Sequence, residues 1–246
     1  MKLAGLEQEA LDLFWHLCGE EEPFPRNLER PLALALPIAL VKLPRLRLWD
    51  VERWIQQRGN NFVFGCESRS VRGCLIAQSG QGVLFVDGSD PTDEQRITIA
   101  HEIAHFLCDY WLPRRTAIGK FGPTIAEALD GIRPLTVTER VHALLSDTKV
   151  GPYQSLMERS ESANSDHIWK AENRADRLAL ALLAPSQAVF PLLDFLSEPY
   201  PVRLQKTKEV LRRSFGLPVT VAAGYAGSLL AEIGKGPSWV ESLGLR

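Results

Sequence analysis

The chain lacks closely spaced cysteines. Its 246 residues include four cysteines, Cys18, Cys66, Cys74 and Cys108, and no two of them form a CxxC pair. This spacing indicates neither a disulfide framework nor a cysteine zinc site. Reduced thiols in a cytoplasmic protein are the simplest interpretation.

Membrane and secretory signals are also missing. The most apolar stretch, from Leu32 to Leu43, is broken by Pro37 and is too short to cross a bilayer. The first residues carry one lysine and then several acids, instead of a long apolar run with a small-residue cleavage site. We therefore expect a soluble cytoplasmic protein with no membrane partner.

Neither sign of charge dominates. The chain has 28 basic and 30 acidic residues and a formal charge of −2. Such a balance gives no general attraction to nucleic acid or to anionic lipid, so any binding of this kind would have to be local. The 45% apolar and 24% charged fractions are typical of a globular protein that buries a sizeable core.

Histidine is scarce, yet two of the five histidines fall in one H-E-x-x-H motif, His101-Glu102-Ile103-Ala104-His105. On an α-helix, residues four apart lie on one face, so both imidazoles can bind the same ion, and zinc is the metal that this motif favours. Glu102 lies on the neighbouring flank, and we predict that it is the general base. The alternative is a buried helix whose histidines are satisfied by hydrogen bonds.

A zinc site with two histidines needs a third protein ligand. Glu172 and Asp176 share one face of a later apolar helix, so we predict Glu172 as the ligand and Asp176 as the partner of a histidine N–H. Alternatively, both carboxylates pair with basic neighbours on a solvated face. His142 and His167 are rival ligands, although no motif surrounds either of them.

Two segments together resemble the ImmA/IrrE family of zinc metallopeptidases. The first is the motif helix with its preceding residues, 95–105, and the second runs from Glu172 to Pro185. Members of that family carry an "FTIAHELGH" helix and a later "E-x-x-A-N-x-F-A-x-x-L-L-M-P" helix. The combination of the two motifs is more specific than either alone.

The resemblance implies a gluzincin-type zinc site. By that resemblance His101, His105 and Glu172 bind Zn²⁺, Glu102 is catalytic, and Asp176 stands where the family usually has asparagine. It also implies cytoplasmic proteolysis of a regulatory protein, commonly a helix-turn-helix transcriptional repressor. This chain has a longer segment between the two motifs than the family pattern, and that segment could be a lid, a specificity element or a partner site.

The hydrophobic periodicity predicts an α+β fold, with a small antiparallel sheet before the H-E-x-x-H helix and additional helices at both ends. The family resemblance implies that this sheet packs on the H-E-x-x-H helix and the glutamate helix. The expected elements are strands at 61–66, 71–78 and 83–87, an extended segment at 31–44, a motif helix at about 91–110, a loop at 151–166 and a glutamate helix from 166 to 185.

Three regions are expected along the chain. Residues 1–48 form an N-terminal helix and extended segment, and residues 49–200 form the zinc metallopeptidase domain, with an insert at about 114–165. Residues 201–246 form a C-terminal helical pair that packs on the catalytic domain. The sequence assigns no oligomeric state.

These residues favour a zinc-dependent endopeptidase that hydrolyses a peptide bond in a regulatory protein. An extended substrate is expected to pair with the strand at 71–78 or at 83–87. The candidate donors to the developing oxyanion are Tyr110, His142, Tyr153 and His167.

Two other functions remain open. The chain could be a regulatory, DNA-binding or scaffold protein with little or no peptidase activity, in which Lys206, Lys208, Arg212 and Arg213 form a basic helix face. Glu209 reduces the net positive charge of that face, and basic helix faces of this size usually contact solvent without binding a partner. The chain could also hold zinc while its peptidase activity waits for a partner to dock.

Overall fold

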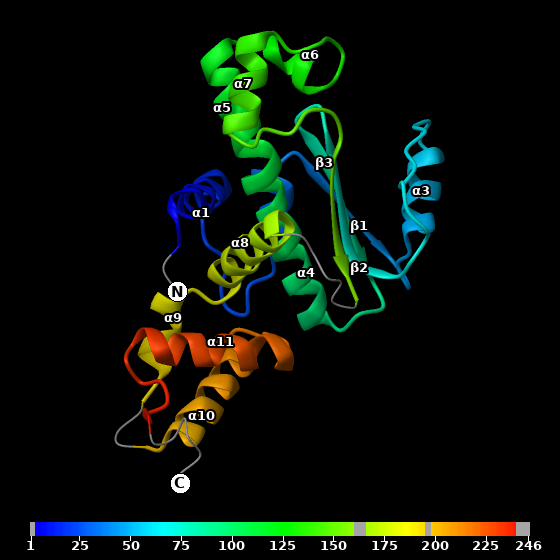
Figure 1. Ribbon diagram of the computed structural model, residues 1–246. Coiled ribbons are helices and arrows are strands. Elements are labelled where there is room, and N and C mark those ends of the chain that lie inside the picture. The colour runs from blue at the N-terminus through cyan, green and yellow to red at the C-terminus, as the bar shows by residue number, and fades with distance from the viewer. Residues whose placement is uncertain (1–2, 160–165, 195–197, 240–246) are drawn as a thin grey trace.

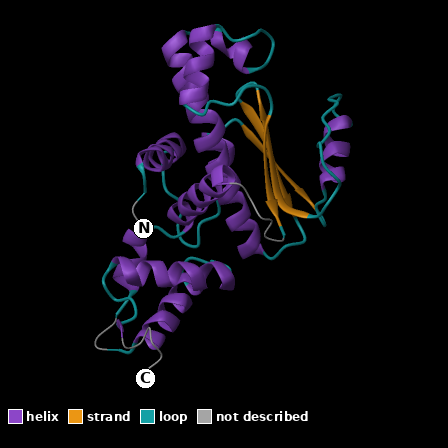
Figure 2. Cartoon of the chain, viewed as in Figure 1, coloured by secondary structure: helices purple, strands orange, loops and turns teal. Residues whose placement is uncertain are grey.

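The computed structural model describes residues 3–159, 166–194 and 198–239, without the side chains of residues 166–168. Its described part is an α+β structure with one four-stranded sheet and helices at both ends of the chain (Figures 1 and 2), so the predicted fold class is confirmed. Within these residues no helix is long and apolar enough to cross a membrane.

The sheet has the strand order β1-β3-β2-β4. The strands are β1 (Ile38–Leu43), β2 (Val71–Gln78), β3 (Gln81–Asp87) and β4 (Tyr153–Glu158). β2 pairs antiparallel with both β3 and β4, whereas β1 pairs parallel with β3. The sheet is therefore mixed, with edges β1 and β4, and the prediction of a purely antiparallel sheet is wrong for the β1–β3 pair.

The β2–β3 hairpin is confirmed. Its two-residue turn consists of Ser79 and Gly80, both with positive φ, at 52° and 78°. Turns of this kind match the right-handed twist of the flanking strands and favour glycine.

Two expectations for single elements are wrong, and a third holds only in part. Residues 61–66 contain no strand. The extended segment expected at 31–44 is confirmed from Ile38 to Leu43, which form the edge strand β1, whereas its first residues belong to a helix, α2 (Glu29–Ala35). Pro31 does not prevent that helix, because it lies in the first turn, where its missing N–H costs nothing. The expected loop at 151–166 contains β4, so part of the predicted insert belongs to the sheet. The domain boundaries themselves stay a prediction.

The two faces of the sheet pack on different helices. Leu75 and Leu84 face the large core shared with the long helices, whereas Cys74 and Phe85 face a smaller core beneath α3 (Leu48–Gln56). Because side chains alternate along a strand, each interior strand supplies both cores. Figure 1 shows α3 alone on one side of the sheet and the other helices on the opposite side.

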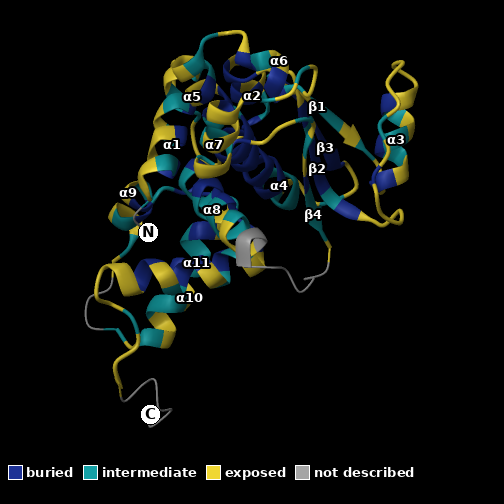
Figure 3. Ribbon diagram, turned by 45° about the horizontal axis from the view of Figure 1, so that its top comes forward, coloured by how far each residue is buried: buried dark blue, intermediate teal, exposed yellow. Residues whose placement is uncertain are grey.

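A nearly continuous helical rod crosses the large core. It consists of α4 (Thr92–His105), a π-helical turn η1 (Phe106–Trp111) and α5 (Leu112–Phe121), so it extends beyond the expected end of the motif helix. Every residue of α4 from Ile97 to His105 is buried, as the dark colour of α4 in Figure 3 shows. Pro113 lacks an N–H to donate to the preceding turn, and the wider π turn lies where this interruption falls.

The remaining helices cover the core and the two ends of the molecule. α8 is the glutamate helix and packs along α4, while α5, α6 and α7 lie together at one end of the molecule (Figure 1). Their bounds are α1 (Gly5–Cys18), α6 (Ile125–Leu129), α7 (Val137–Leu145), α8 (Asp166–Leu183), α9 (Ser186–Val189), the 3₁₀ turn η2 (Phe190–Leu192), α10 (Tyr200–Arg213) and α11 (Val219–Glu232).

The C-terminal helices α10 and α11 contact the rest of the fold through polar and apolar groups. Arg96 Nη2 donates to the carbonyl of Gly216 at 2.6 Å, and Tyr225 donates its hydroxyl to the carbonyl of Ala184 at 3.0 Å. Gly216 has a φ of 63°, and a Cβ there would lie 2.1 Å from Arg96 Nη2. This turn therefore requires glycine for both its conformation and its close approach to α4.

Gly73 in β2 lets α4 approach the sheet. A Cβ there would lie 2.5 Å from Thr98 Cγ2 and 3.3 Å from Glu102 Oε1. Gly73→Ala should therefore lower the free energy of unfolding, measured by chemical denaturation, by about 1–3 kcal/mol, because the β-branched Thr98 is stiff.

Two controls separate overpacking from a general effect of alanine. Thr98→Ser removes the clashing methyl group, so the Gly73→Ala/Thr98→Ser variant should recover much of the loss. Gly65→Ala places its Cβ in open space and should change the free energy of unfolding by less than about 0.5 kcal/mol. Equal losses for Gly73→Ala and Gly65→Ala would contradict this account.

Candidate metal centre

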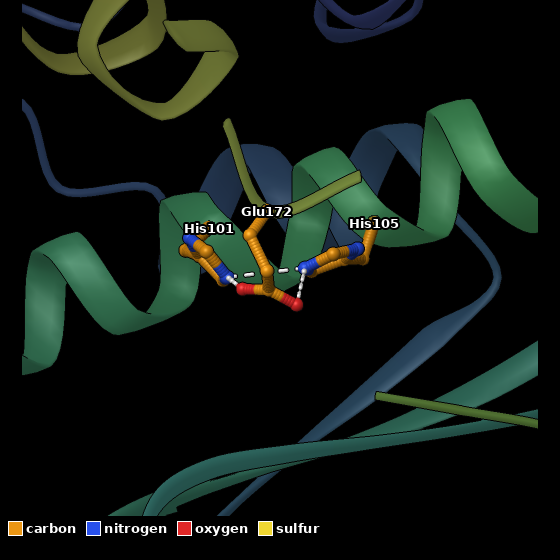
Figure 4. A group of neighbouring side chains, drawn as sticks. All are labelled: His101, His105 and Glu172. Carbon is orange, nitrogen blue, oxygen red and sulfur yellow. Dashed lines mark hydrogen bonds and ion pairs between the residues drawn. The ribbon is translucent and has the colours of Figure 1, made fainter. Parts of the chain in front are cut away.

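Three predicted ligands converge on one point. His101 and His105 of α4 face Glu172 of α8 (Figure 4). Their Nε2 atoms lie 3.0 Å apart, Glu172 Oε2 lies 3.2 Å from His101 Nε2, and Glu172 Oε1 lies 3.5 Å from His105 Nε2. Both imidazoles are buried and the carboxylate is partly exposed, so the group lies between the core and solvent.

Helix packing brings these groups together. The two histidines are one turn apart on α4. On α8 the buried residues Ala175, Leu178, Ala179 and Leu182 recur at helical spacing and form the face that enters the large core. The small alanines allow the helices to lie close together, and Glu172 is one turn before this apolar face.

Each histidine is held from behind by a carboxylate. His101 Nδ1 lies 2.9 Å from Asp176 Oδ1, which is the contact expected for Asp176. His105 Nδ1 lies 2.6 Å from Asp109 Oδ2. A carboxylate accepts hydrogen bonds, so each Nδ1 donates a proton and each Nε2 directs its lone pair toward Glu172.

Asp109 was missed in the sequence, although its spacing from His105, i to i+4, could have indicated it. It lies in the π turn η1, forms an ion pair with Arg174 of α8, and accepts a hydrogen bond from the Tyr153 hydroxyl at 3.2 Å. Burial alone would raise the pKa of Asp109, but His105 and Arg174 lower it below its usual range. Asp109 is thus ionised, and its contacts with Arg174 and Tyr153 hold it in the position from which it fixes the His105 ring.

The centre attracts positive charge. Burial lowers the pKa of His101, but its hydrogen bonds with Asp176 and Glu172 outweigh burial and raise it to about 10. Similarly, burial raises the pKa of Glu172, but the two histidines outweigh it and lower that pKa. Two lone pairs and a carboxylate that face one another need a proton or a metal cation between them.

The donor set fits zinc. Tetrahedral coordination with bonds of about 2.0–2.1 Å places neighbouring ligand atoms roughly 3.3 Å apart, and the three separations of 3.0, 3.2 and 3.5 Å bracket that value. Two imidazoles and one carboxylate also leave a fourth position for water or substrate. His101, His105 and Glu172 could therefore hold a metal ion.

Glu102 is fully buried beside this group. Neither of its carboxylate oxygens has a hydrogen-bond partner among the described residues. Burial raises the pKa of Glu102, and the nearby His105, His101 and the Ser155 hydroxyl only partly oppose the rise. A buried acid without a partner costs stability, so its retention indicates a chemical role.

The histidines open into a cleft of about 1140 Å³. One wall is β4, from Tyr153 to Glu158, and the other includes residues of α8 from Trp169 to Asp176. Because β4 is an edge strand, one side of its backbone has no sheet partner among the described residues. The expectation that substrate pairs with 71–78 or 83–87 is wrong, since β2 and β3 both lie inside the sheet.

The other polar candidates lie away from the centre or behind it. Tyr110 accepts a hydrogen bond from the backbone N–H of Gly80 at 2.7 Å, and His142 contacts Lys120 and Ser146. Neither residue lines the cleft. Tyr153 lines the cleft, but its hydroxyl contacts Asp109 at 3.2 Å and His105 Nδ1 at 3.4 Å, on the side of His105 that faces away from Glu172. His167 has a side chain outside the described residues.

Residues 68–129 match the sequence model of a known metallopeptidase family, the IrrE N-terminal-like domain of peptidase family M78. The predicted resemblance to the ImmA/IrrE family is confirmed. The IrrE-like segment runs from before β2 through α4 to α6, so it includes His101, Glu102 and His105 but not Glu172. No curated protein and no solved structure matches the chain. The family supports a metallopeptidase of the IrrE type that acts on protein.

Asp109→Ala should weaken zinc binding about 10–100-fold, because His105 would lose the group that fixes its ring and its tautomer. Competition with a chromophoric chelator measures this affinity. Asp12→Asn, at an exposed aspartate on α1, is the matched control and should bind zinc as the unmodified chain does. Equal affinity for the Asp109→Ala variant would show that Asp109 does not position the ligand.

Zinc affinity should fall as the pH falls. The pKa of His101 is raised to about 10 and that of His105 is also raised, so the metal-free centre holds protons at neutral pH. Zinc must displace them, which costs about tenfold in affinity per pH unit for each proton displaced. Titrations between about pH 6 and 8, with proton release measured in parallel, test this. A constant affinity over that range would contradict it.

Proposed function

We propose that the chain is a zinc-dependent endopeptidase of the gluzincin type. One observation carries the proposal: His101, His105 and Glu172 converge beside the buried, unpartnered carboxylate of Glu102, on the wall of an open cleft. The match of residues 68–129 to a metallopeptidase family supports it independently.

Each residue has a defined role in this proposal. His101, His105 and Glu172 hold the metal, and Asp176 and Asp109 fix the two imidazole rings. When bound, the metal supplies Lewis acidity, which lowers the pKa of water in the site and polarises a carbonyl group. Glu102 accepts the proton of the attacking water at a carboxylate oxygen and then delivers it to the leaving amine.

The substrate is an extended polypeptide that adds to the free edge of β4. Backbone N–H and C=O groups along such an edge bind an incoming strand without regard to its side chains. β4 lines the cleft along its whole length, so a strand paired with it would pass the histidines. Burial of the two histidines and of Glu102 strengthens the electrostatic interactions among them.

The protein target is proposed from the family resemblance alone. We infer a regulatory protein, namely a helix-turn-helix transcriptional repressor, cleaved in the cytoplasm. The resemblance to ImmA/IrrE metallopeptidases is the support for both statements.

The alternative of a DNA-binding or scaffold protein has less support. The basic face on α10 is partly neutralised, since Lys206 forms an ion pair with Glu198 at 2.5 Å. This face also lies far from the metal centre. DNA binding would not explain why His101, His105 and Glu172 converge at the cleft. Salt-dependent binding of duplex DNA that Arg212→Ala/Arg213→Ala abolishes would favour this alternative.

Glu102→Gln should retain zinc and lower peptidase turnover about 10²–10⁴-fold, because glutamine cannot accept a proton. The test uses the zinc-loaded chain with a library of extended peptides, and mass spectrometry of the products. Since an uncharged amide costs less to bury than an unpartnered carboxylate, the free energy of unfolding should stay the same or rise by up to about 2 kcal/mol.

Glu9→Gln, at an exposed glutamate on α1, is the matched control and should leave turnover and zinc content unchanged. Undiminished turnover of the Glu102→Gln variant would refute the general-base role. Stoichiometric zinc with no turnover of any peptide by the unmodified chain would instead favour a centre that is dormant until a partner docks.

A further inference from the structure

The helix α7 presents an unpartnered apolar stripe. Val137, Val141, Leu144 and Leu145 are 79%, 51%, 82% and 80% exposed. They are spaced i, i+4, i+7 and i+8, so they form one continuous face on the helix. Figure 3 shows exposed residues on α7, whereas amphipathic helices normally turn such a face into a core.

Polar contacts, and not this apolar face, hold α7 in place. The buried residue of the helix is Glu139, which receives two hydrogen bonds from Arg133 at 2.8 and 2.9 Å and caps the helix together with Thr136. On the inner side, His142 contacts the ring of Phe121. Within the part of the chain that the structure describes, the apolar stripe therefore packs against nothing and is available to a partner.

The segment that follows the stripe lines the substrate cleft. Asp147 and Lys149, directly after α7, line the cleft, and β4 begins at Tyr153. A polypeptide that pairs with β4 would leave the cleft at the Tyr153 end beside α7. Arg140, which is exposed on the same side of α7 as Val137 and Leu144, adds a positive charge to the stripe.

The size of the stripe excludes a stable dimer as its main purpose. A helix of nine residues is about 14 Å long, and one face of it falls far below the roughly 800 Å² per partner of a stable interface. Such a surface suits a second contact by a molecule that is already held elsewhere, because tethering raises its effective concentration.

We propose that the α7 stripe is a docking site for an amphipathic helix of the protein substrate. That helix has apolar residues at i, i+3, i+4 and i+7 and an acidic residue that meets Arg140. The substrate would thus be bound twice, as an extended strand along β4 and as a helix on α7. This inference rests on the proposed peptidase function, and it adds the structural class of the substrate.

The test compares tethered and untethered probes. The untethered probe is an extended fluorogenic peptide chosen from the library for cleavage by the zinc-loaded chain. The tethered probes carry, through a flexible linker at one end or the other, an amphipathic helix with leucines at i, i+3, i+4 and i+7 and a flanking glutamate. At least one tethered probe should show a kcat/KM about tenfold higher than that of the untethered peptide.

Charge placed on the stripe should remove this gain. The Leu144→Glu/Leu145→Glu variant should cleave the untethered peptide normally and lose the advantage of the tethered probe. Val202→Glu/Val219→Glu changes two exposed residues on α10 and α11, at the opposite end of the molecule (Figure 1), and should keep that advantage. Tethered and untethered probes of equal kcat/KM would overturn the proposal.

Binding without catalysis provides the second readout. Fluorescence anisotropy of the labelled helix alone, titrated with the metal-free chain at high concentration, should show weak binding that Leu144→Glu/Leu145→Glu abolishes, because an untethered helix lacks the raised effective concentration. If no peptide is cleaved, the proposed function fails, and this measurement still decides whether the stripe binds a helix. Sedimentation that shows a dimer, which the same variant converts to a monomer, would assign the stripe to a second copy and overturn the proposal.

Discussion

The structure depends on a meeting of basic groups between α4 and α8 that a proton or a metal cation must hold together. Asp176 and Asp109 accept from the outer nitrogens of His101 and His105, so the inner nitrogens face Glu172 and hold either a proton or a metal ion. The carboxylate of Glu172 closes the triangle. Such an arrangement repels itself unless a cation occupies it, and the large apolar core beneath the two helices keeps it together.

The sequence reveals local features of this centre better than distant ones. The motif pair and the Glu172–Asp176 pair could be predicted because helical spacing alone puts each pair on one face. β4 could not, because its residues include polar ones and its position depends on pairing with β2, far away in the chain. Asp109 follows the same helical spacing, but its importance rests on Arg174 and Tyr153, which only the fold brings to it.

Burial around Glu102 shows how the fold supports a group that is unfavourable to bury. The carboxylate lies against Gly73, where a larger residue would contact it and Thr98. The surrounding interior is apolar and close-packed, so the cost of one unpartnered acid is spread over many favourable contacts. Glu102 thus lowers the stability of the fold in return for its chemical role, whereas the apolar residues packed around it raise that stability.

The open edge of β4 has a second consequence. Unpaired strand edges invite neighbouring molecules to join sheet to sheet and to aggregate. Here the edge forms one wall of a cleft whose other wall includes residues of α8. A second sheet that approached this edge would meet α8, so the helix that supplies Glu172 also limits association of the protein through its own sheet.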